Sequence, residues 1–311
     1  MADTLNALMG RLRIRQLNLL IALDEHRSLH RAAAALSITQ SAASKSLAEV
    51  ESMIEAPLFE RSKSGIVPNQ LGQCVIRYAR LLRTDLGALC QEIAEIRSGR
   101  GGRIAVGAIM GAIPGLLVPT INWLHARQPN LSIEVVEGGS DHLLSLLDEG
   151  RLDLAIARTT VSPNPAQYNY QPLEDEPTSI VVGYTHPRIR TKQMTLRELE
   201  KYHWVTYPSR MPIRALLERE LDLAGLTMPG NPIETASTFA TVTLLQNRAD
   251  LVSLLPTAVA QFFAAHRMLR ILPIRLTARI QTFGIVTRRG GALSPAAAEF
   301  VRLLREREMA H

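Results

Sequence analysis

The sequence predicts an α/β protein with a small helical N-terminal domain, one long helix and a two-lobed C-terminal domain. The chain has 311 residues, which exceeds the ~250–300 residues that one hydrophobic core usually supports. Apolar residues recur at helical spacing through the first hundred positions. After the glycine-rich segment 99–102, strand-like and helix-like runs alternate, which indicates βαβ units around a parallel sheet.

Composition places the chain among ordinary globular proteins. Hydrophobic residues make up 46% and charged residues 21%, which excludes a disordered or collagen-like chain. The net charge of +6 fits a polyanionic partner. It is not concentrated in one half: residues 1–100 hold 13 Lys+Arg against 10 Asp+Glu, and the remaining residues hold 22 against 19. Charge alone therefore does not locate the partner.

We expect a cytoplasmic protein with no membrane segment. The longest apolar run, Leu251–Ala265, is interrupted by polar residues and a proline, and it is shorter than the ~18–20 residues that a span needs. The first residues lack the apolar core of a signal peptide. Cys74 and Cys90 are the two cysteines, and we interpret them as structural thiols in a reducing compartment.

The N-terminal segment predicts three short helices and a hairpin, together a winged helix-turn-helix over residues 1–69, which we class as all-α. A first helix spans the leucines that follow position 12. Ser28 is the expected N-cap of a second helix that ends at Leu36, and Thr39 the N-cap of a third over Gln40–Glu55. Two short strands, 58–61 and 66–68, flank a polar loop with a glycine.

This arrangement predicts a DNA interface, because a helix with polar residues at its N-terminal end fits the major groove. Gln40 can pair with adenine through two hydrogen bonds. Arg61 could instead pair with Glu55 or Glu60, and the serine-rich helix could simply face solvent. The expected DNA-binding residues are Ser28, Arg31, Thr39, Gln40, Ser41, Ser44, Lys45, Arg61, Lys63 and Asn69.

A long helix is expected over residues 70–98. Its apolar residues recur every three or four positions, which forms a narrow stripe along nearly thirty residues. Such a stripe indicates a partner helix and hence a dimer. Packing of the helix on its own domain is the alternative. The glycines of residues 99–102 end the helix and form a hinge.

The remaining residues, 103–311, predict two lobes that enclose a ligand cleft. The first lobe is expected over about 103–162 and 266–311, the second over about 163–265. Predicted strands are 104–107, 131–136, 152–157, 179–184, 204–207, 233–236, 251–255, 269–274 and 280–287. Predicted helices are 116–128, 141–149, 196–202, 212–224, 238–247, 257–264 and a last one from Pro295. Ligands of such folds bind beyond the carboxyl ends of the strands.

Three loops at these strand ends are candidates for effector contact. The expected effector-binding residues are Ile109, Met110, Gly111, Tyr207, Pro208, Ser209, Arg210, Thr235, Ser237 and Thr238. The hydroxyl residues could instead be ordinary helix caps. Arg210 and Arg214 could hold an anionic effector through paired hydrogen bonds, or they could pair with Glu218 or Glu220 on their own helix.

The N-terminal motif resembles that of LysR-type transcriptional regulators. The resemblance rests on the run from Ser28 to Lys45 and on Pro57–Arg61, and it extends to Pro129–Glu134 and Glu149–Ile156. The segments Trp204–Pro208 and Leu293–Ala297 look like the branch with galactose-binding-protein and aromatic-degradation regulators.

The resemblance implies a periplasmic-binding-protein-like domain for a small co-inducer. It also implies a dimer of dimers on operator DNA and contact with RNA polymerase. Three positions depart from the family pattern: Arg27 replaces a common glycine, Ser41 a common proline, and Pro68-Asn69 a common Leu-Thr pair. The last change leaves Asn69 to cap the long helix or to contact phosphate.

We do not expect an enzyme, a metal site or a bound cofactor. The sequence has no nucleophile-elbow, zincin, P-loop or dinucleotide-binding motif. Gly138–His142 groups nucleophile and base residue types, but we interpret it as a turn before a helix. A cytosolic ligand sensor without transcription control is the alternative. That class would explain residues 100–311 and leave the winged helix unexplained.

Overall fold

The computed structural model describes residues 10–62, 65–98, 102–173, 175–187, 194–228, 230–278 and 280–308. The chain divides into two compact units, one of residues 1–100 with 148–151 and one of residues 101–147 with 152–311. Among the described helices, none has the length and apolar character that a membrane crossing requires.

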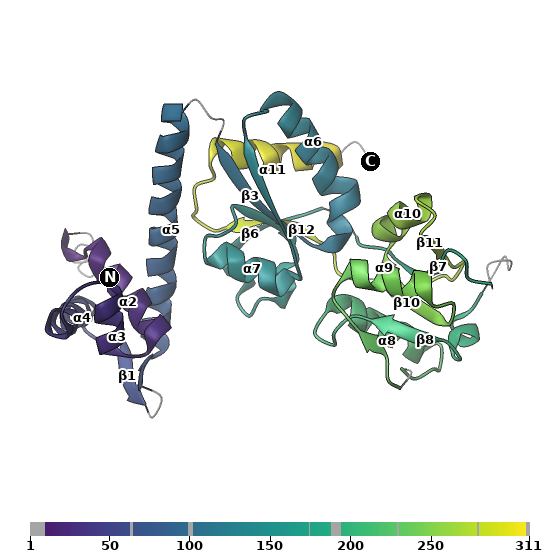
Figure 1. Cartoon of the computed structure of the whole chain (residues 1–311), viewed down its shortest axis with the longest axis horizontal. Coiled ribbons are helices and arrows are strands. Elements are labelled where there is room, and N and C mark those ends of the chain that lie inside the picture. Colours follow the sequence, from purple (N-terminus) through teal and green to yellow (C-terminus); the bar gives the residue numbers. More distant parts are fainter. Residues whose placement is uncertain are drawn as a thin grey trace. The chain divides into compact units, whose positions relative to one another are not determined.

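The N-terminal unit is a winged helix-turn-helix followed by a long helix (Figure 1). Its elements are α2 (Ile14–His26), α3 (Leu29–Ala35), α4 (Gln40–Ile54), β1 (Phe59–Ser62), β2 (Gly65–Pro68) and α5 (Gln70–Ser98). The wing is a two-stranded antiparallel sheet, so the domain is mainly helical but not all-α. Small residues bring α3 and α4 close, because Ala32, Ala33 and Ala43 are buried in one core with Leu19 and Leu23.

The turn between α2 and α3 contains a left-handed residue. Arg27 has φ 49° at the C-cap of α2. Its carbonyl accepts a hydrogen bond from the amide of Ile66 in the wing. A side chain at Gly65 would meet this carbonyl at 2.2 Å, so the wing approaches the turn closely only because residue 65 is glycine.

The first lobe of the second unit is built on a five-stranded sheet in the order β4-β3-β5-β12-β6. The strands are β3 (Arg103–Ala108), β4 (Ser132–Glu137), β5 (Leu154–Ala157), β6 (Tyr168–Pro172) and β12 (Gly284–Arg288). A short π-helical turn, Ile113–Leu117, precedes α6 (Val118–Arg127). With α7 (Ser140–Asp148) and α11 (Pro295–Glu308), α6 covers the sheet (Figure 1).

The second lobe has a sheet in the order β11-β7-β10-β8-β9. Its strands are β7 (Thr178–Gly183), β8 (His203–Thr206), β9 (Ile233–Glu234), β10 (Leu251–Pro256) and β11 (Leu269–Ile271). Its α-helices are α8 (Pro212–Leu223), α9 (Thr238–Asn247) and α10 (Thr257–Ala265). Trp204 on β8 is almost fully buried in this core.

The strand directions and lobe limits differ from the sequence prediction. Both sheets are mixed: β12 runs antiparallel to β5 and β6, and β7 runs antiparallel to β10 and β11. The predicted limits place β6 and β11 in the wrong lobes, because β6 pairs with β12 and β11 pairs with β7. The reason is that the chain passes between the lobes after β6 and after β11 rather than before them, and each of these strands pairs with an antiparallel neighbour.

Candidate DNA interface and effector cleft

The N-terminal end of α4 presents an exposed polar surface. Gln40, Ser41, Ser44 and Lys45 are all exposed, whereas Ala43 and Val50 of the same helix are buried. Thr39 starts the helix, because its hydroxyl accepts the amide of Ala42 at 3.2 Å. The structure therefore brings four of the predicted DNA-binding side chains to one helix end.

Two predicted DNA-binding side chains already hold helix ends. The Ser28 hydroxyl accepts the amide of Arg31 at 3.4 Å. The amide oxygen of Asn69 accepts from Gly72 at the start of α5, and its nitrogen donates to the carbonyl of Pro57 at 2.8 Å. The Arg31 side chain is exposed on α3. Lys63 and the side chain of Arg61 lie outside the described residues, so their roles stay predictions.

An exposed apolar stripe runs along α5. Leu71, Tyr78, Leu82, Leu89 and Ile93 are exposed at spacings that alternate between seven and four residues. This is the spacing of one seam of a coiled coil. On its other side, α5 packs on α2: Ala79 lies against Leu17 and Ile21, and Arg80 pairs with Asp24 at 2.7 Å.

The second unit contains a cleft of about 750 Å³. Its wall combines loops that follow β3, β4 and β5 with the N-terminal ends of α8 and α9. Five predicted effector residues line it: Ile109, Met110, Arg210, Ser237 and Thr238. The other five, Gly111, Tyr207, Pro208, Ser209 and Thr235, are not part of this lining.

Of these five, Gly111 and Tyr207 contact residues that line the cleft, Glu176 and Met110. A side chain at Gly111 would meet the carboxylate of Glu176 at 1.8 Å, so this glycine allows Glu176 to lie against the backbone. Thr235 has a local role, since its hydroxyl accepts the amide of Ser237. Ser237 in turn caps α9 by accepting the amide of Ala240, as the capping alternative predicted.

One group of side chains joins the two lobes across the cleft. Met110, which follows β3, reaches two side chains of the second lobe. The Tyr207 hydroxyl donates to its sulfur at 3.3 Å, and the Thr238 hydroxyl also donates to it. Tyr207 is buried, with 3% exposure. Burial raises the pKa of Tyr207 well above its usual value; Thr238 lowers it in part, and Glu176 and Glu137 raise it further.

The sequence analysis missed a buried ion pair in the cleft. Arg158 directly follows β5, and its Nη2 donates to Glu176 at 2.7 Å. Its Nε donates to the carbonyl of Gln281 at 2.6 Å. Glu176 and Gln281 belong to the two chain segments that connect the lobes, so Arg158 ties both connections together. Arg158 directly follows a predicted strand, as Ile109 does, so the same rule could have identified it as a cleft residue.

Arg214 is bonded within the second lobe, which favours the alternative to the anionic-ligand hypothesis. Its guanidinium donates to Glu218 at 2.7 Å, to Thr206 at 2.8 Å and to Glu234 at 3.1 Å. These bonds satisfy the alternative in which Arg214 pairs on its own helix. Arg210 lines the cleft and is exposed. Of the two arginines predicted to hold an anionic effector, Arg214 is therefore bonded within the second lobe, and Arg210 faces the cleft.

Gly138–His142 also lines the cleft. Ser140 is the first residue of α7, and its hydroxyl accepts the amide of Arg158 at 3.1 Å. The serine therefore joins α7 to the end of β5, which agrees with the interpretation of this segment as a turn before a helix. Asp141 lies in the first turn of α7, where a helix N-terminus stabilises a carboxylate.

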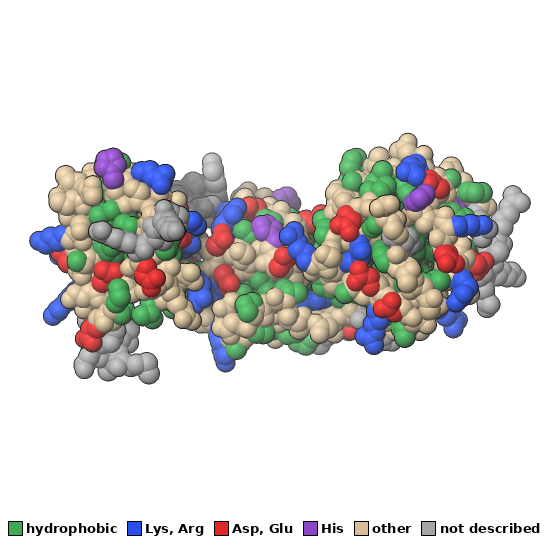
Figure 2. Space-filling model, turned by 90° about the horizontal axis from the view of Figure 1, so that it is seen from below, with side chains coloured by type: hydrophobic (Ala, Val, Ile, Leu, Met, Phe, Trp, Pro, Cys, Tyr) green, Lys and Arg blue, Asp and Glu red, His purple; other side chains and the backbone are tan. Residues whose placement is uncertain are grey.

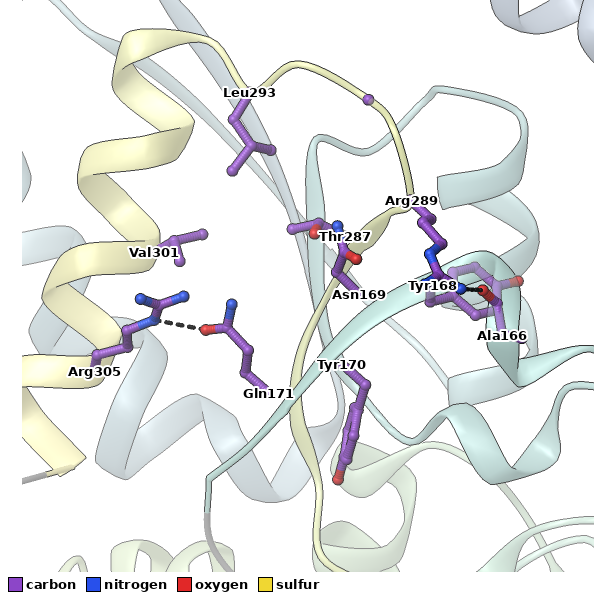
Figure 3. Close-up of a pocket in the computed structure, with 11 residues that line it drawn as sticks. Ala166, Tyr168, Asn169, Tyr170, Gln171, Thr287, Arg289, Leu293, Val301 and Arg305 are labelled. Carbon is purple, nitrogen blue, oxygen red and sulfur yellow. Dashed lines mark hydrogen bonds between the residues drawn. The ribbon is translucent and has the colours of Figure 1, made fainter.

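A second cavity, of about 520 Å³, lies in the first lobe beside the edge strand β6 (Figure 3). Its two arginines bond within the protein. Arg305 donates to Gln171 at 2.6 Å, and Arg289 donates to the carbonyl of Ala166 at 3.1 Å. Because both guanidinium groups already have partners, this cavity offers a ligand less than the cleft does.

The face shown in Figure 2 has no large patch of one charge, because basic and acidic side chains are interspersed on it. Along the sequence, residues 1–100 and residues 101–311 each carry a net charge of +3, so the basic excess is denser in the first part without being confined to it. A DNA interface in this chain therefore depends on the placement of a few side chains rather than on a large basic field.

A winged helix-turn-helix joined to a two-lobed domain with a ligand cleft defines a DNA-binding regulator that senses a small molecule. Residues 14–73 match the model of the bacterial regulatory helix-turn-helix protein, lysR family, and residues 97–308 match that of the LysR substrate binding domain. The chain belongs to the LysR family of transcriptional regulators. A ligand sensor without DNA binding would lack the helix-turn-helix domain that residues 14–73 match.

Relatives and solved structures agree with this family. The regulator GbpR of Azospirillum brasilense is 32% identical over 299 residues, which are 96% of this chain and 87% of that protein. Full-length CbnR in complex with its target DNA has a TM-score of 0.62 at 19% identity, over 95% of this chain and all of CbnR. The effector-binding domain of QuiR in complex with shikimate has a TM-score of 0.56 at 17% identity, over 68% of this chain and 98% of that domain.

Proposed function

We propose that this regulator reads operator DNA with the N-terminal end of α4 and binds its co-inducer in the cleft of the second unit. The exposed polar cluster Gln40, Ser41, Ser44 and Lys45 on a capped helix carries the proposal. Gln40 specifies a base, and the shorter hydroxyl side chains and Lys45 bind phosphate or base edges. Arg31, Arg61 and Lys63 contribute phosphate contacts on either side.

The exposed stripe of α5 supports a dimer. Leu82 and Leu89 are each about half exposed, and burying such side chains against a second α5 is favourable. A dimer presents two recognition helices to a pseudo-palindromic site. Pairing of the C-terminal domains would then give a dimer of dimers that holds and bends DNA.

The co-inducer acts by binding two arrangements of this assembly with different affinity. Because the cleft is lined by both lobes, an occupant changes the free energy of any motion that separates them. A shift in the bend of the DNA would change the recruitment of RNA polymerase. These roles place the protein in the cytoplasm, and no catalytic step is needed for them.

A gel-shift titration tests the proposal. Purified protein is titrated with fragments of the DNA that it occupies in the cell, mapped genome-wide. We expect protein–DNA complexes that migrate slowly in the gel and weaken as the salt concentration rises. The affinity for DNA should be lower in Gln40→Ala than in the unmodified protein. Binding that is indifferent to both α4 substitutions and DNA sequence would contradict it. The genes beside the occupied sites would also indicate the chemistry of the effector.

A further inference from the structure

The hydroxyls of Tyr207 and Thr238 are directed at a poor acceptor. The Tyr207 hydroxyl also has a hydrogen bond with the Thr238 side chain. As donors, however, both hydroxyls face the Met110 thioether, and thioether sulfur accepts hydrogen bonds only weakly. Tyr207 is almost fully buried, so its hydroxyl has lost water as an alternative partner. A buried donor with a weak partner keeps much of its desolvation cost.

Met110 is the movable member of the three. It is only half-buried and lines the cleft, and its unbranched side chain has several rotatable bonds. Tyr207 follows β8 and is held by the core of the second lobe. A ligand oxygen that enters the cleft can therefore displace the sulfur and accept from both hydroxyls without moving the second lobe.

The charges around this point favour an uncharged oxygen. Glu176 and Glu137 line the same cleft as Met110 and act electrostatically on the Tyr207 hydroxyl. The guanidinium of Arg158 is already paired with Glu176, and Asp141 occupies the first turn of α7. Arg210 is the other arginine of the described lining, and it is exposed. Because Arg158 offsets the charge of Glu176, the like charge that a carboxylate at the Met110 position would face is mainly that of Glu137.

We propose that the Met110 sulfur holds the place of an uncharged carbonyl or hydroxyl oxygen of the co-inducer, which binds by accepting from Tyr207 and Thr238. The proposal rests on the cleft being the effector site. It refines the anionic-effector hypothesis: a carboxylate elsewhere on the ligand could still reach Arg210, but the group that joins the two lobes is neutral.

The proposal can be tested without a ligand by substituting Met110. Met110→Gln supplies an amide oxygen on a side chain of similar length, and Met110→Leu supplies no acceptor at similar volume. In the full chain, Met110→Gln should raise the Tm of the effector domain above that of Met110→Leu by about 2–4 °C, the shift expected for one hydrogen bond. In a Tyr207→Phe, Thr238→Val background the difference should vanish.

An equal difference in both backgrounds would overturn the proposal. If Met110→Gln does not fold, Tyr207→Phe in a Thr238→Val background decides, because that background lacks the hydrogen bond between the Tyr207 and Thr238 side chains. A thioether partner predicts a Tm loss below about 2 °C, and a larger loss means that the hydroxyl already has a strong acceptor.

A binding test separates charge from shape. Isothermal titration of the full chain with small amides and acids in which the carboxylate replaces the neutral group on one skeleton, such as benzamide and benzoate, should give tighter binding of the uncharged member. That binding should weaken at least tenfold in Met110→Gln. Tighter binding of the acids would overturn the proposal. Uncharged ligands that bind in this way without changing the DNA complex would instead contradict the proposed function.

Discussion

Gln40 is exposed in the first turn of α4, and its amide can donate to and accept from one adenine edge. Gln40→Ala should therefore relax the preference at one base position of each half-site by about 1–3 kcal/mol. Competition binding with operators that vary at single positions measures this. A uniform loss over all sequences would show that Gln40 only positions the helix.

Lys45 has a different role, because its ammonium is a point charge with no base pattern to match. Lys45→Ala should weaken binding to all sites alike and reduce the slope of log K against log salt by about 1. We expect the same of Lys63→Ala. The matched control is Lys201→Ala, which removes an exposed lysine from the second lobe. An unchanged slope in Lys45→Ala would remove Lys45 from the interface.

At the scale of residues, the sequence predicts caps well and cleft contacts only in part. Ser28, Thr39 and Ser237 cap the helices that were expected, since capping depends on three neighbouring residues. Glu176 had no local signal: it lies in an irregular segment, and its partner Arg158 comes from another strand. Pairings of this kind depend on the fold of the whole unit.

Among the elements, the turn between α2 and α3 carries a testable strain. Arg27 has a positive φ, which costs a side-chain-bearing residue about 1 kcal/mol relative to glycine. Arg27→Gly should therefore be more stable than Arg27→Ala by about 1 kcal/mol in urea unfolding. At Arg31, in the first turn of α3, the order should reverse, because glycine disfavours a helix by about 1 kcal/mol. The same order at both sites would contradict the assigned turn.

The exposed stripe of α5 predicts the assembly state. Leu82→Glu with Leu89→Glu places charges in the proposed seam, so the dimer should dissociate at micromolar concentration in analytical ultracentrifugation. Leu223→Glu is the control, since Leu223 is also strongly exposed but lies on α8. Sedimentation of the double variant as a species of unchanged mass would contradict pairing through α5.

The elements themselves were predicted closely where periodicity is strong. The limits of α9, and of α4 and α5 within one residue, agree with the sequence prediction. The edge strand β6 was missed because its alternation of aromatic and polar residues covers only four positions before Pro172. The predicted 196–202 helix is a single 3-10 turn. These short elements are fixed by their neighbours in the sheet rather than by local propensity.

For the whole molecule, the pattern of alternating strands and helices predicted two lobes and two passages between them but placed both passages too early in the chain. Directions in both sheets and the membership of β6 and β11 depend on where the chain passes between the lobes, which leaves no periodic signal. The net charge of +6 fitted a polyanionic partner without locating it. We propose that this partner binds at the exposed end of α4.

The most direct test of the account is selection of binding sites from random DNA by the purified full chain. The account predicts enrichment of a pseudo-palindromic site with two equivalent half-sites, and loss of preference at one position of each half-site in Gln40→Ala. Failure to enrich any sequence, or an enriched site that Gln40→Ala leaves unchanged, would contradict a regulator that reads DNA with α4.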